Sequence, residues 1–391
     1  MEESTPPSRG RAALLNEKGT DMRYNNLGES GLLVSELGLG CMTFTDGEGT
    51  AMRVERAFDA HVRGGVDTQR AYEMMELAYR SGVNFFDTAE SYGGGGVSDR
   101  ILGEAIQIGL KRGIWERPDL VISTKLFGGG RGARDTVNSI GLSRKHLYEG
   151  MKASLERLRL EYVDVVFCHR PDPRTPIEET VRGMNFLLDR GLAFYWGTSE
   201  WPPLQLQQAA QCAERLGLVG PCVEQCEYNA LKRERVEVEY EGLRPRLGLM
   251  TWAPLASGLL AGKYAEQVPP DSRMSYGLRS ASADARQQAE SGLRERSAVA
   301  LRLAPLAREL DCSLAQLAIA WCLTNDRVSS VLLGATSSEQ LAENLKAVQV
   351  AGRLRGQPDM LERMERLLGN KPKGDFYARV SGERRTSRAR L

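Results

Sequence analysis

Short apolar runs recur along the chain, and each is followed by a stretch with the spacing of a helix. The first run alternates polar and apolar residues, whereas the later runs are mostly continuous, as expected of parallel strands covered on both faces. Strands that alternate with helices in this way predict an α/β fold of a single domain, the (β/α)8 or TIM barrel. The eight runs lie at Leu33–Leu39, Val83–Phe86, Leu120–Ser123, Val163–Phe167, Ala193–Trp196, Cys222–Gln225, Leu247–Thr251 and Ser330–Leu333.

Capping residues mark the starts of two of these helices. Ser143 precedes a segment whose apolar side chains fall on one face, at Leu147, Met151, Leu155 and Leu158. Ser337 stands three residues before Gln340, which is the spacing of a capping box. An open doubly wound sheet is the competing fold, but it normally carries a G-x-G-x-x-G turn after its first strand. The corresponding turn reads LGLGCM and lacks that spacing, so this fold is rejected.

We expect the barrel to span residues 22–372, between a disordered leader at 1–21 and a basic, disordered tail at 373–391. Two segments exceed a minimal barrel. One is an insert at 46–65 between the first strand and its helix, and the other is the polar segment 269–296. Loops at the first of these positions are usually short, so the insert is either functional or disordered.

Composition argues against several classes of function. The net charge of +1 gives no basis for binding nucleic acid. We expect no membrane span and no signal peptide, because apolar segments of the needed length are lacking. The 7 cysteines are scattered, which indicates reduced thiols in a cytoplasmic protein, and 3 histidines leave little room for a metal site.

Side chains that can do chemistry follow most of the apolar runs, namely Asp87, Lys125, His169, Ser199, Gln225 and Trp252. In a parallel barrel these positions meet at one rim, where barrel enzymes have their active sites. Singly, Asp87 fits a helix N-cap, Lys125 a surface lysine and His169 a hydrogen-bonded core histidine. Jointly, and with Tyr92 close behind Asp87, they predict a catalytic site.

The chemistry of this set suits the reduction of a carbonyl group. A carboxylate such as Asp87 keeps a neighbouring lysine charged, and the Lys125 cation favours the phenolate of a nearby tyrosine. Tyr92 then becomes a proton donor near neutral pH, while His169 orients the carbonyl oxygen. Because no side chain supplies a hydride, the set needs a cofactor, and a nicotinamide provides one.

The C-terminal half offers a place for that cofactor. Ser199 and Gln225 suit an amide group, and Trp252 offers a flat face for an aromatic ring. The small-residue loop APLASGLLAGKY and the helix start GATSSEQLAEN suit phosphates. Lys263 and Arg273 suit a 2′-phosphate, which favours NADPH over NADH, with solvated surface charge as the alternative for both cations.

The segments NFFDTAESY, ISTK, FYWGTSEW, PCVEQCEYN and TWAPLASGLLAGKY resemble the aldo-keto reductase superfamily, and within it the plant-type voltage-gated potassium channel β-subunits. The resemblance covers about residues 24–372. It implies a catalytic tetrad of Asp87, Tyr92, Lys125 and His169, with Tyr92 as the general acid. It also implies NADP(H) contacts at Ser199, Gln225, Trp252, Pro254, Leu255, Lys263, Ser272, Arg273, Thr336, Gln340, Glu343 and Asn344.

Two functions follow from the resemblance. One is an NADPH-dependent reductase of aldehydes and ketones. The other is a cytosolic β-subunit that regulates a voltage-gated potassium channel, with NADP(H) as a redox sensor. Such a subunit would form a homotetramer at the membrane through its channel partner.

Three departures from the family pattern bear on this choice. His169 stands where animal β-subunits often carry asparagine, so the reductase-like tetrad is complete and favours an enzyme. Glu200 stands where animal β-subunits carry arginine, whereas plant-type members look like this chain at that position. The insert at 46–65 lies near the expected pocket, and a third hypothesis is that it blocks the pocket and leaves a cofactor-binding relic.

Overall fold

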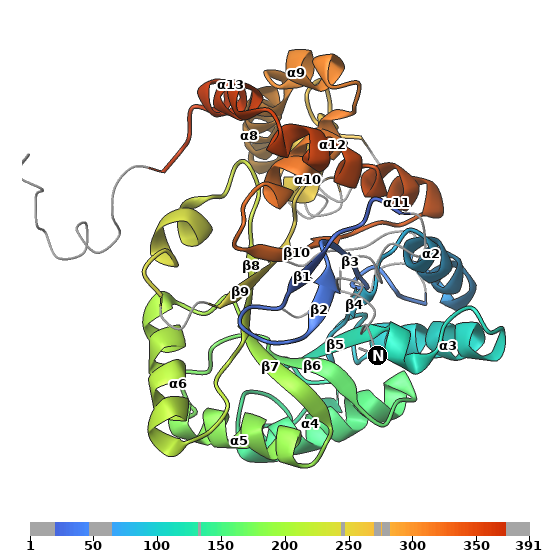
Figure 1. The fold of residues 1–391 in the computed structure, drawn as a ribbon, viewed down its shortest axis with the longest axis vertical. Coiled ribbons are helices and arrows are strands. Elements are labelled where there is room, and N and C mark those ends of the chain that lie inside the picture. Colours follow the sequence, from blue (N-terminus) through green and yellow to red (C-terminus); the bar gives the residue numbers. More distant parts are fainter. Residues whose placement is uncertain are drawn as a thin grey trace, which may run out of the picture.

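The chain forms a closed barrel of parallel strands surrounded by helices (Figure 1). The structure is a computed structural model that describes residues 20–46, 65–131, 134–243, 247–269, 275 and 282–372. Across these residues, eight strands pair in the closed order β10-β3-β4-β5-β6-β7-β8-β9, which confirms the predicted (β/α)8 fold. They are β3 (Leu37–Gly40), β4 (Phe85–Asp87), β5 (Val121–Leu126), β6 (Val163–Cys168), β7 (Ala193–Ser199), β8 (Val223–Glu227), β9 (Gly248–Trp252) and β10 (Val328–Leu333).

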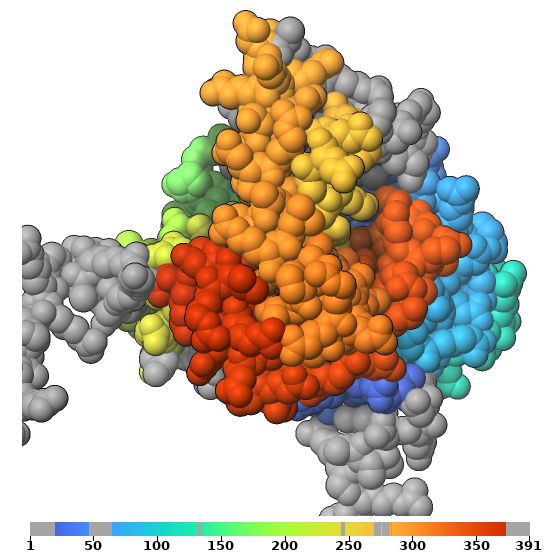
Figure 2. Space-filling model, turned by 90° about the horizontal axis from the view of Figure 1, so that it is seen from above, coloured from blue at the N-terminus to red at the C-terminus, as the bar shows by residue number. Residues whose placement is uncertain are grey.

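Helices return the chain from strand to strand on the outside of the barrel. The helices α2 to α6 follow β3 to β7 in turn, whereas β8 is followed by a π-helical turn, η3 (Arg235–Glu239). The C-terminal helices, coloured orange to red, gather on one face (Figure 2). The helices are α2 (Thr68–Arg80), α3 (Val97–Lys111), α4 (Arg144–Leu158), α5 (Ile177–Asp189), α6 (Pro203–Leu216), α8 (Ala283–Leu301), α9 (Ala304–Glu309), α10 (Leu314–Leu323), α11 (Ser338–Leu345), α12 (Ala347–Arg355) and α13 (Pro358–Leu368), with 3-10 turns η1 (Arg117–Asp119) and η4 (Ala256–Ala261).

The first apolar run forms two strands, not one. Residues Leu33–Ser35 form β2, which pairs antiparallel with β1 (Tyr24–Asn26). Only Leu37–Gly40 enters the barrel, as β3. The prediction of a single strand over Leu33–Leu39 was therefore wrong in its first half. The alternation that distinguished this run is typical of an antiparallel strand, which explains why it differed from the other seven runs.

The β1–β2 hairpin closes the N-terminal end of the barrel. Its residues Leu27 and Val34 are fully buried and belong to the same apolar cluster as Phe85, which points into the barrel. At Gly28 the backbone has a φ of 61°, and a Cβ there would meet the carbonyl oxygen of Cys222 at 2.2 Å. Glycine permits both this conformation and this close approach. The opposite end of the barrel is the one left for a site, as is usual in this fold.

The period of two along each strand decides which side chains point into the barrel. On β5, Val121 packs in the barrel interior, whereas Ile122 and Leu126 belong to the outer cluster between barrel and helices. Ser123 and Lys125 share the inward face with Val121, because they lie two and four residues further on. The interior of the barrel is therefore apolar at its closed end and polar at its open end.

Helix caps confirm one prediction and correct another. Ser143 caps α4 by accepting a hydrogen bond from the backbone N–H of His146, and the predicted apolar face of α4 is buried. Ser337 likewise caps α11 through the N–H of Gln340. The Gln340 side chain, however, accepts from the N–H and the hydroxyl of Thr336. The Gln340 side chain thus binds Thr336, the residue before the N-cap Ser337, and not the backbone N–H of Ser337 that a reciprocal capping box would use.

Several predicted segments lie mostly outside the described residues. These are the leader at 1–21, the insert at 46–65 and the tail at 373–391, while the polar segment 269–296 is described chiefly from residue 282 onward. Within the described ranges, no helix is both long enough and apolar enough to cross a membrane. The same residues contain no group of three or more His, Cys, Asp or Glu side chains that could hold a metal ion. All 7 cysteines of the chain are free thiols.

Candidate active site

Asp87, Lys125 and Tyr92 form a chain of buried polar contacts at the open end of the barrel. The Lys125 Nζ atom lies 2.5 Å from Asp87 Oδ2 and 3.1 Å from the Tyr92 hydroxyl oxygen. It also donates to the carbonyl oxygen of Thr88 at 2.8 Å. Lys125 is fully buried and Asp87 nearly so, which shields this ion pair from water and strengthens it.

Asp87 is held on its other side by neutral donors. The Ser123 hydroxyl donates to Asp87 Oδ1 at 2.7 Å, and the Gln225 amide donates to the same oxygen at 3.2 Å. Ser123 lies within reach because β4 and β5 pair in a register that sets Asp87 opposite it. Asp87 is not a helix cap, since Gly96 occupies the N-cap position of the helix that follows. The simplest alternative for Asp87 is thereby excluded.

The protonation state of Lys125 follows from its partners. Burial lowers the pKa of the Lys125 ammonium, but the charge of Asp87 and the contacts with Tyr92 together raise it by more. The pKa of Lys125 therefore lies above its usual value, and the side chain is a cation at physiological pH. Its Nζ atom also lies 4.6 Å from the centre of the Tyr92 ring. A cation so placed stabilises negative charge on the Tyr92 oxygen.

His169 joins this group from the end of β6. Its imidazole packs edge-on against the Tyr92 ring, with the ring centres 5.6 Å apart. Burial, with the positive charges of Arg170 and Lys125, lowers the pKa of His169 well below its usual value. The ring is therefore neutral at physiological pH. A neutral imidazole keeps one N–H donor, so it can hydrogen-bond to an oxygen without adding a second cation beside Lys125.

The glycines after Tyr92 carry the chain along a defined path into α3. All four, at positions 93–96, have a positive φ, from 73° to 105°. Glycine adopts this left-handed region without the steric cost that other residues meet. Tyr92 itself is held by its backbone, because its N–H donates to the carbonyl of Ala89 and its carbonyl accepts from the N–H of Ser98. The position of the tyrosine is thus set by the main chain on both sides.

Two of the predicted cofactor residues, Ser199 and Gln225, line the same end of the barrel from β7 and β8. Both are buried. The Ser199 Oγ atom accepts a hydrogen bond from Arg170 at 3.2 Å, and the Gln225 amide faces Asp87. Gln225 is therefore in direct contact with the ion pair, whereas Ser199 is joined to Arg170, the neighbour of His169.

The aromatic ring of Trp252, at the end of β9, is oriented by Glu200. The Trp252 indole N–H donates to Glu200 Oε1 at 3.1 Å. The same oxygen accepts from the backbone N–H of Glu227 at 2.7 Å, and Glu200 Oε2 pairs with Arg235. Glu200 is thus fixed on both of its oxygens and holds the edge of the half-buried indole, which also packs against the apolar interior of the barrel. The departure at position 200 has a structural role that the sequence did not indicate.

The loop after β9 has an unusual backbone. Ala253, Ala256 and Ser257 have φ values of 55°, 48° and 58°. Non-glycine residues in this region cost about 1–3 kcal/mol each and tend to cluster at functional sites. Pro254 and Leu255, two predicted cofactor residues, lie inside this stretch. The strain supports a functional role for the loop, which the sequence marked only by its small side chains.

The remaining predicted cofactor residues lie away from the buried ion pair or outside the described residues. Lys263 is exposed, and so are Gln340 and Glu343, whereas Asn344 is buried. The contacts of Thr336 and Gln340 stay at the start of α11, and Glu343 accepts from Gln316 of α10. They are not in contact with the buried ion pair. Ser272 and Arg273 lie outside the described residues.

Three residues of the site were not anticipated from the sequence. Ser123 donates to Asp87. It lies two residues before Lys125 on β5 and so faces the same side of the strand, a pattern from which it could have been predicted. Arg170 donates to the carbonyl of His169 at 2.6 Å and to the Ser199 hydroxyl at 3.2 Å. No local sequence pattern predicts the contact with Ser199. Glu90, three residues after Asp87, is fully buried.

Comparison with known proteins identifies the barrel. Residues 36–355 match the model of the Aldo/keto reductase family. The chain belongs to the aldo/keto reductase family. Members of this family are generally NADP-dependent oxidoreductases. The matched residues run from the start of the barrel to the end of α12, so they contain the whole cluster of polar residues around Asp87.

Among aldo/keto reductases, the chain is similar to two plant proteins that carry the same description, "Probable voltage-gated potassium channel subunit beta". One is from Oryza sativa subsp. japonica and the other from Arabidopsis thaliana. Each is 46% identical over 357 residues, which is 90% of this chain and 98% of the relative. The resemblance to the plant-type members of this branch is confirmed.

Proposed function

We propose that this aldo/keto reductase is an NADPH-dependent reductase of aldehydes and ketones, with Tyr92 as the general acid. The observation that carries the proposal is the Lys125 ammonium, paired with Asp87 at 2.5 Å and within 3.1 Å of the Tyr92 hydroxyl. The burial of all three side chains supports it, since charge interactions are strongest where water is excluded.

Each side chain has one task in this reaction. Tyr92 gives its hydroxyl proton to the carbonyl oxygen of the substrate as negative charge develops there. Lys125 stabilises the phenolate that remains, and Asp87 keeps the lysine charged and in place. The neutral His169 donates its N–H to the same carbonyl oxygen and orients the substrate.

The residues at the barrel mouth fit a nicotinamide cofactor by their chemistry. The Ser199 hydroxyl and the Gln225 amide suit its carboxamide, and the Trp252 face suits its ring. The strained loop after β9 offers backbone groups for the phosphates, and Lys263 with Arg273 suits a 2′-phosphate. When bound, the cofactor supplies the hydride.

Tyr92→Phe tests the general acid. We expect this change to lower kcat at least about 100-fold, because only the proton donor is lost, while NADPH still binds. Turnover is measured as NADPH consumption with a reactive aldehyde, and binding as quenching of tryptophan fluorescence. Tyr148→Phe is the matched control, because Tyr148 is an exposed tyrosine on α4 whose ring packs edge-on against Phe186, away from the site. Wild-type turnover by Tyr92→Phe would rule out this mechanism.

A second function is a β-subunit that regulates a voltage-gated potassium channel with bound NADP(H) as redox sensor. The observation that favours it is the description of the two plant relatives, whose length the chain covers almost completely. We expect the protein to form a homotetramer and to be captured by the cytosolic segment of a plant potassium channel. The measurements are light scattering and a pull-down with that segment. A monomer that the segment does not retain would contradict this second function.

A further inference from the structure

Glu90 is a buried carboxylate that the proposed reaction does not use. It lies between Asp87 and Tyr92 in the chain and is fully buried. Its Oε1 atom accepts hydrogen bonds from the backbone N–H groups of Phe127 at 2.6 Å and Gly129 at 3.1 Å. An ionisable side chain in such a place needs a reason, because burying a carboxylate is costly unless it is held by several donors.

The main chain around Glu90 is bound to the strand that carries Lys125. The N–H of Thr88 donates to the carbonyl of Ser123 at 3.0 Å, and the N–H of Glu90 donates to the carbonyl of Lys125 at 3.1 Å. The chain therefore continues to follow β5 after β4 has ended. The Glu90 side chain extends the same attachment to the loop after β5. Tyr92 comes two residues later, so its segment is tied to β5 by the main chain of Glu90 and to the loop after β5 by the Glu90 side chain.

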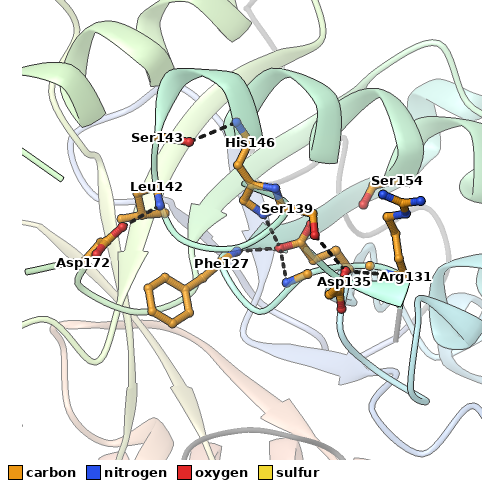
Figure 3. A network of polar contacts seen from close by, with 12 residues as sticks. Phe127, Arg131, Asp135, Ser139, Leu142, Ser143, His146, Ser154 and Asp172 are labelled. Atoms are coloured by element: carbon orange, nitrogen blue, oxygen red, sulfur yellow. Dashed lines mark hydrogen bonds and ion pairs between the residues drawn. The ribbon is translucent and has the colours of Figure 1, made fainter. Parts of the chain in front are cut away.

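Helix α4 provides the wall behind this carboxylate. The His146 Nε2 atom lies 3.0 Å from Glu90 Oε1. One turn further on, a Cβ at Gly150 would meet Glu90 Oε2 at 2.9 Å. Glycine is unfavourable inside a helix, so its presence here is explained by the space that the carboxylate occupies. Figure 3 shows His146 above Phe127 at the start of α4, with Ser143 capping the helix.

The loop after β5 is also fixed at its far end. The N–H of Gly141 donates to the carbonyl of Phe127 at 2.8 Å, and the N–H of Leu142 donates to Asp172 at 2.9 Å, as Figure 3 shows for Leu142 and Asp172. Both ends of the loop are thus hydrogen-bonded, and Glu90 binds its first residues, Phe127 and Gly129. The segment that bears Tyr92 is therefore joined through Glu90 to a loop that is itself hydrogen-bonded at both ends.

We propose that Glu90 is a positioning residue for carbonyl reduction, which holds the Tyr92 hydroxyl at Lys125. This inference rests on the proposed reductase function, in which that contact enables proton transfer. Loss of the carboxylate leaves two backbone N–H groups and His146 without their acceptor, and the Tyr92 segment gains freedom to shift. A displacement of about 1 Å at a catalytic group can cost about 100-fold in rate.

Substitution of Glu90 separates positioning from a general structural role. We expect Glu90→Ala to lower kcat about 10- to 100-fold, while KM for NADPH stays within about twofold. Glu90→Gln retains an acceptor oxygen for Phe127 and Gly129, so it should recover most of kcat. Gly150→Ala keeps the Glu90 carboxylate but places a methyl group against it, so it should lower kcat less than Glu90→Ala does.

Asp135→Ala is the matched control. Asp135 is a carboxylate in the same loop that accepts from the N–H of Arg131 at 3.1 Å and the Ser139 hydroxyl at 3.3 Å. It packs against Gly129, where a Cβ would meet its carboxylate at 2.6 Å, but within the described residues it has no hydrogen bond to Glu90 or Tyr92. We expect its kcat to equal that of the wild type. Equal kcat in Glu90→Ala and wild type would overturn the proposal, and so would an equal loss in Glu90→Gln and Glu90→Ala.

A second measurement needs no substrate and so distinguishes failure of this inference from failure of the proposed function. In hydrogen–deuterium exchange, Glu90→Ala should accelerate exchange at 126–130 and also at 90–98, whereas Asp135→Ala should affect the loop around residues 129 and 135 and leave 90–98 unchanged. Acceleration confined to 126–130 would contradict positioning of Tyr92. If the wild type reduces no aldehyde or ketone, the reductase function fails, and this exchange pattern alone still decides whether Glu90 holds the Tyr92 segment.

Discussion

Two basic side chains at the same site have opposite protonation states. Burial lowers the pKa of both Lys125 and His169, but only Lys125 has Asp87 against it, and its net shift is upward. His169 faces the cations Arg170 and Lys125, which lower its pKa further. One group is thus a fixed charge and the other a neutral donor, and the difference comes from neighbours within hydrogen-bond reach. Both groups suit the proposed protonation of a carbonyl oxygen.

A third buried group, Glu224 on the outer face of β8, makes stability depend on pH. Burial raises the pKa of Glu224 to about 8. The hydrogen bond from the Thr198 hydroxyl lowers this pKa, and the negative charge of Glu200 raises it. Below the unfolded value of about 4.3 the group is protonated in both states. Between that value and about 8 the folded state binds more protons, so stability falls as pH rises through this window.

We therefore expect Glu224→Gln to be more stable than the wild type at about pH 9 and nearly equal to it at about pH 5. The difference should grow by up to roughly 1.4 kcal/mol for each pH unit within the window. Urea unfolding at both pH values measures it. Glu214→Gln, at an exposed position on α6, is the control and should show no such trend. The same difference at both pH values would contradict the role of Glu224.

At the scale of elements, short segments between the strands do much of the positioning. The β1–β2 hairpin closes one end of the barrel, and the strained loop after β9 borders the other. The run of positive φ values at 93–96 leads from Tyr92 into α3. Each of these segments is short, as most connections in compact domains are.

The hairpin offers a direct test of such an approach. Gly28→Ala should destabilise the protein by about 2 kcal/mol or more, because the added Cβ meets Cys222 O at 2.2 Å and the φ of 61° is unfavourable for alanine. Thermal unfolding followed by circular dichroism measures the loss. Gly31→Ala in the same turn is the control, since a Cβ there meets nothing within 4 Å. Equal effects of the two changes would mean that the hairpin does not pack as described.

At the scale of the whole molecule, the barrel brings the ends of its strands to one mouth, where side chains from distant parts of the sequence meet. Asp87, Lys125, His169 and Gln225 come from four strands, and each is inward-facing by the same parity. The candidate cofactor residues, by contrast, all belong to the second half of the chain. A ligand that spans the mouth would therefore contact both halves and stabilise the entire fold.

NADPH binding should accordingly raise the melting temperature. At about 100 times Kd, binding adds about 2.7 kcal/mol of stability, and NADH at the same concentration should add less because it lacks the 2′-phosphate. Differential scanning fluorimetry measures both shifts. Lys263→Ala should reduce the difference between the melting-temperature shifts that NADPH and NADH cause, while leaving the shift with NADH unchanged. Equal shifts with the two cofactors in the wild type would contradict recognition of the 2′-phosphate.

The sequence alone determined the barrel and the placement of chemical groups at its strand ends. Both are local properties, since a strand is marked by its apolar period and its end by the next polar residue. The exception was the first run, where the division into hairpin and barrel strand depended on pairing with residues that no pattern identified.

Only the tertiary structure decided which of these groups touch. The contacts of Lys125 with Tyr92 and of Glu90 with Phe127 span 33 and 37 residues. Trp252 and Glu200 lie 52 residues apart. Such contacts depend on strand register, on side-chain rotamers and on the room that neighbouring helices leave. The apolar period along one segment carries no information on register, rotamers or neighbouring helices. The ion pair of Asp87 with Lys125, and the contacts that hold it, therefore appear only when the barrel is closed.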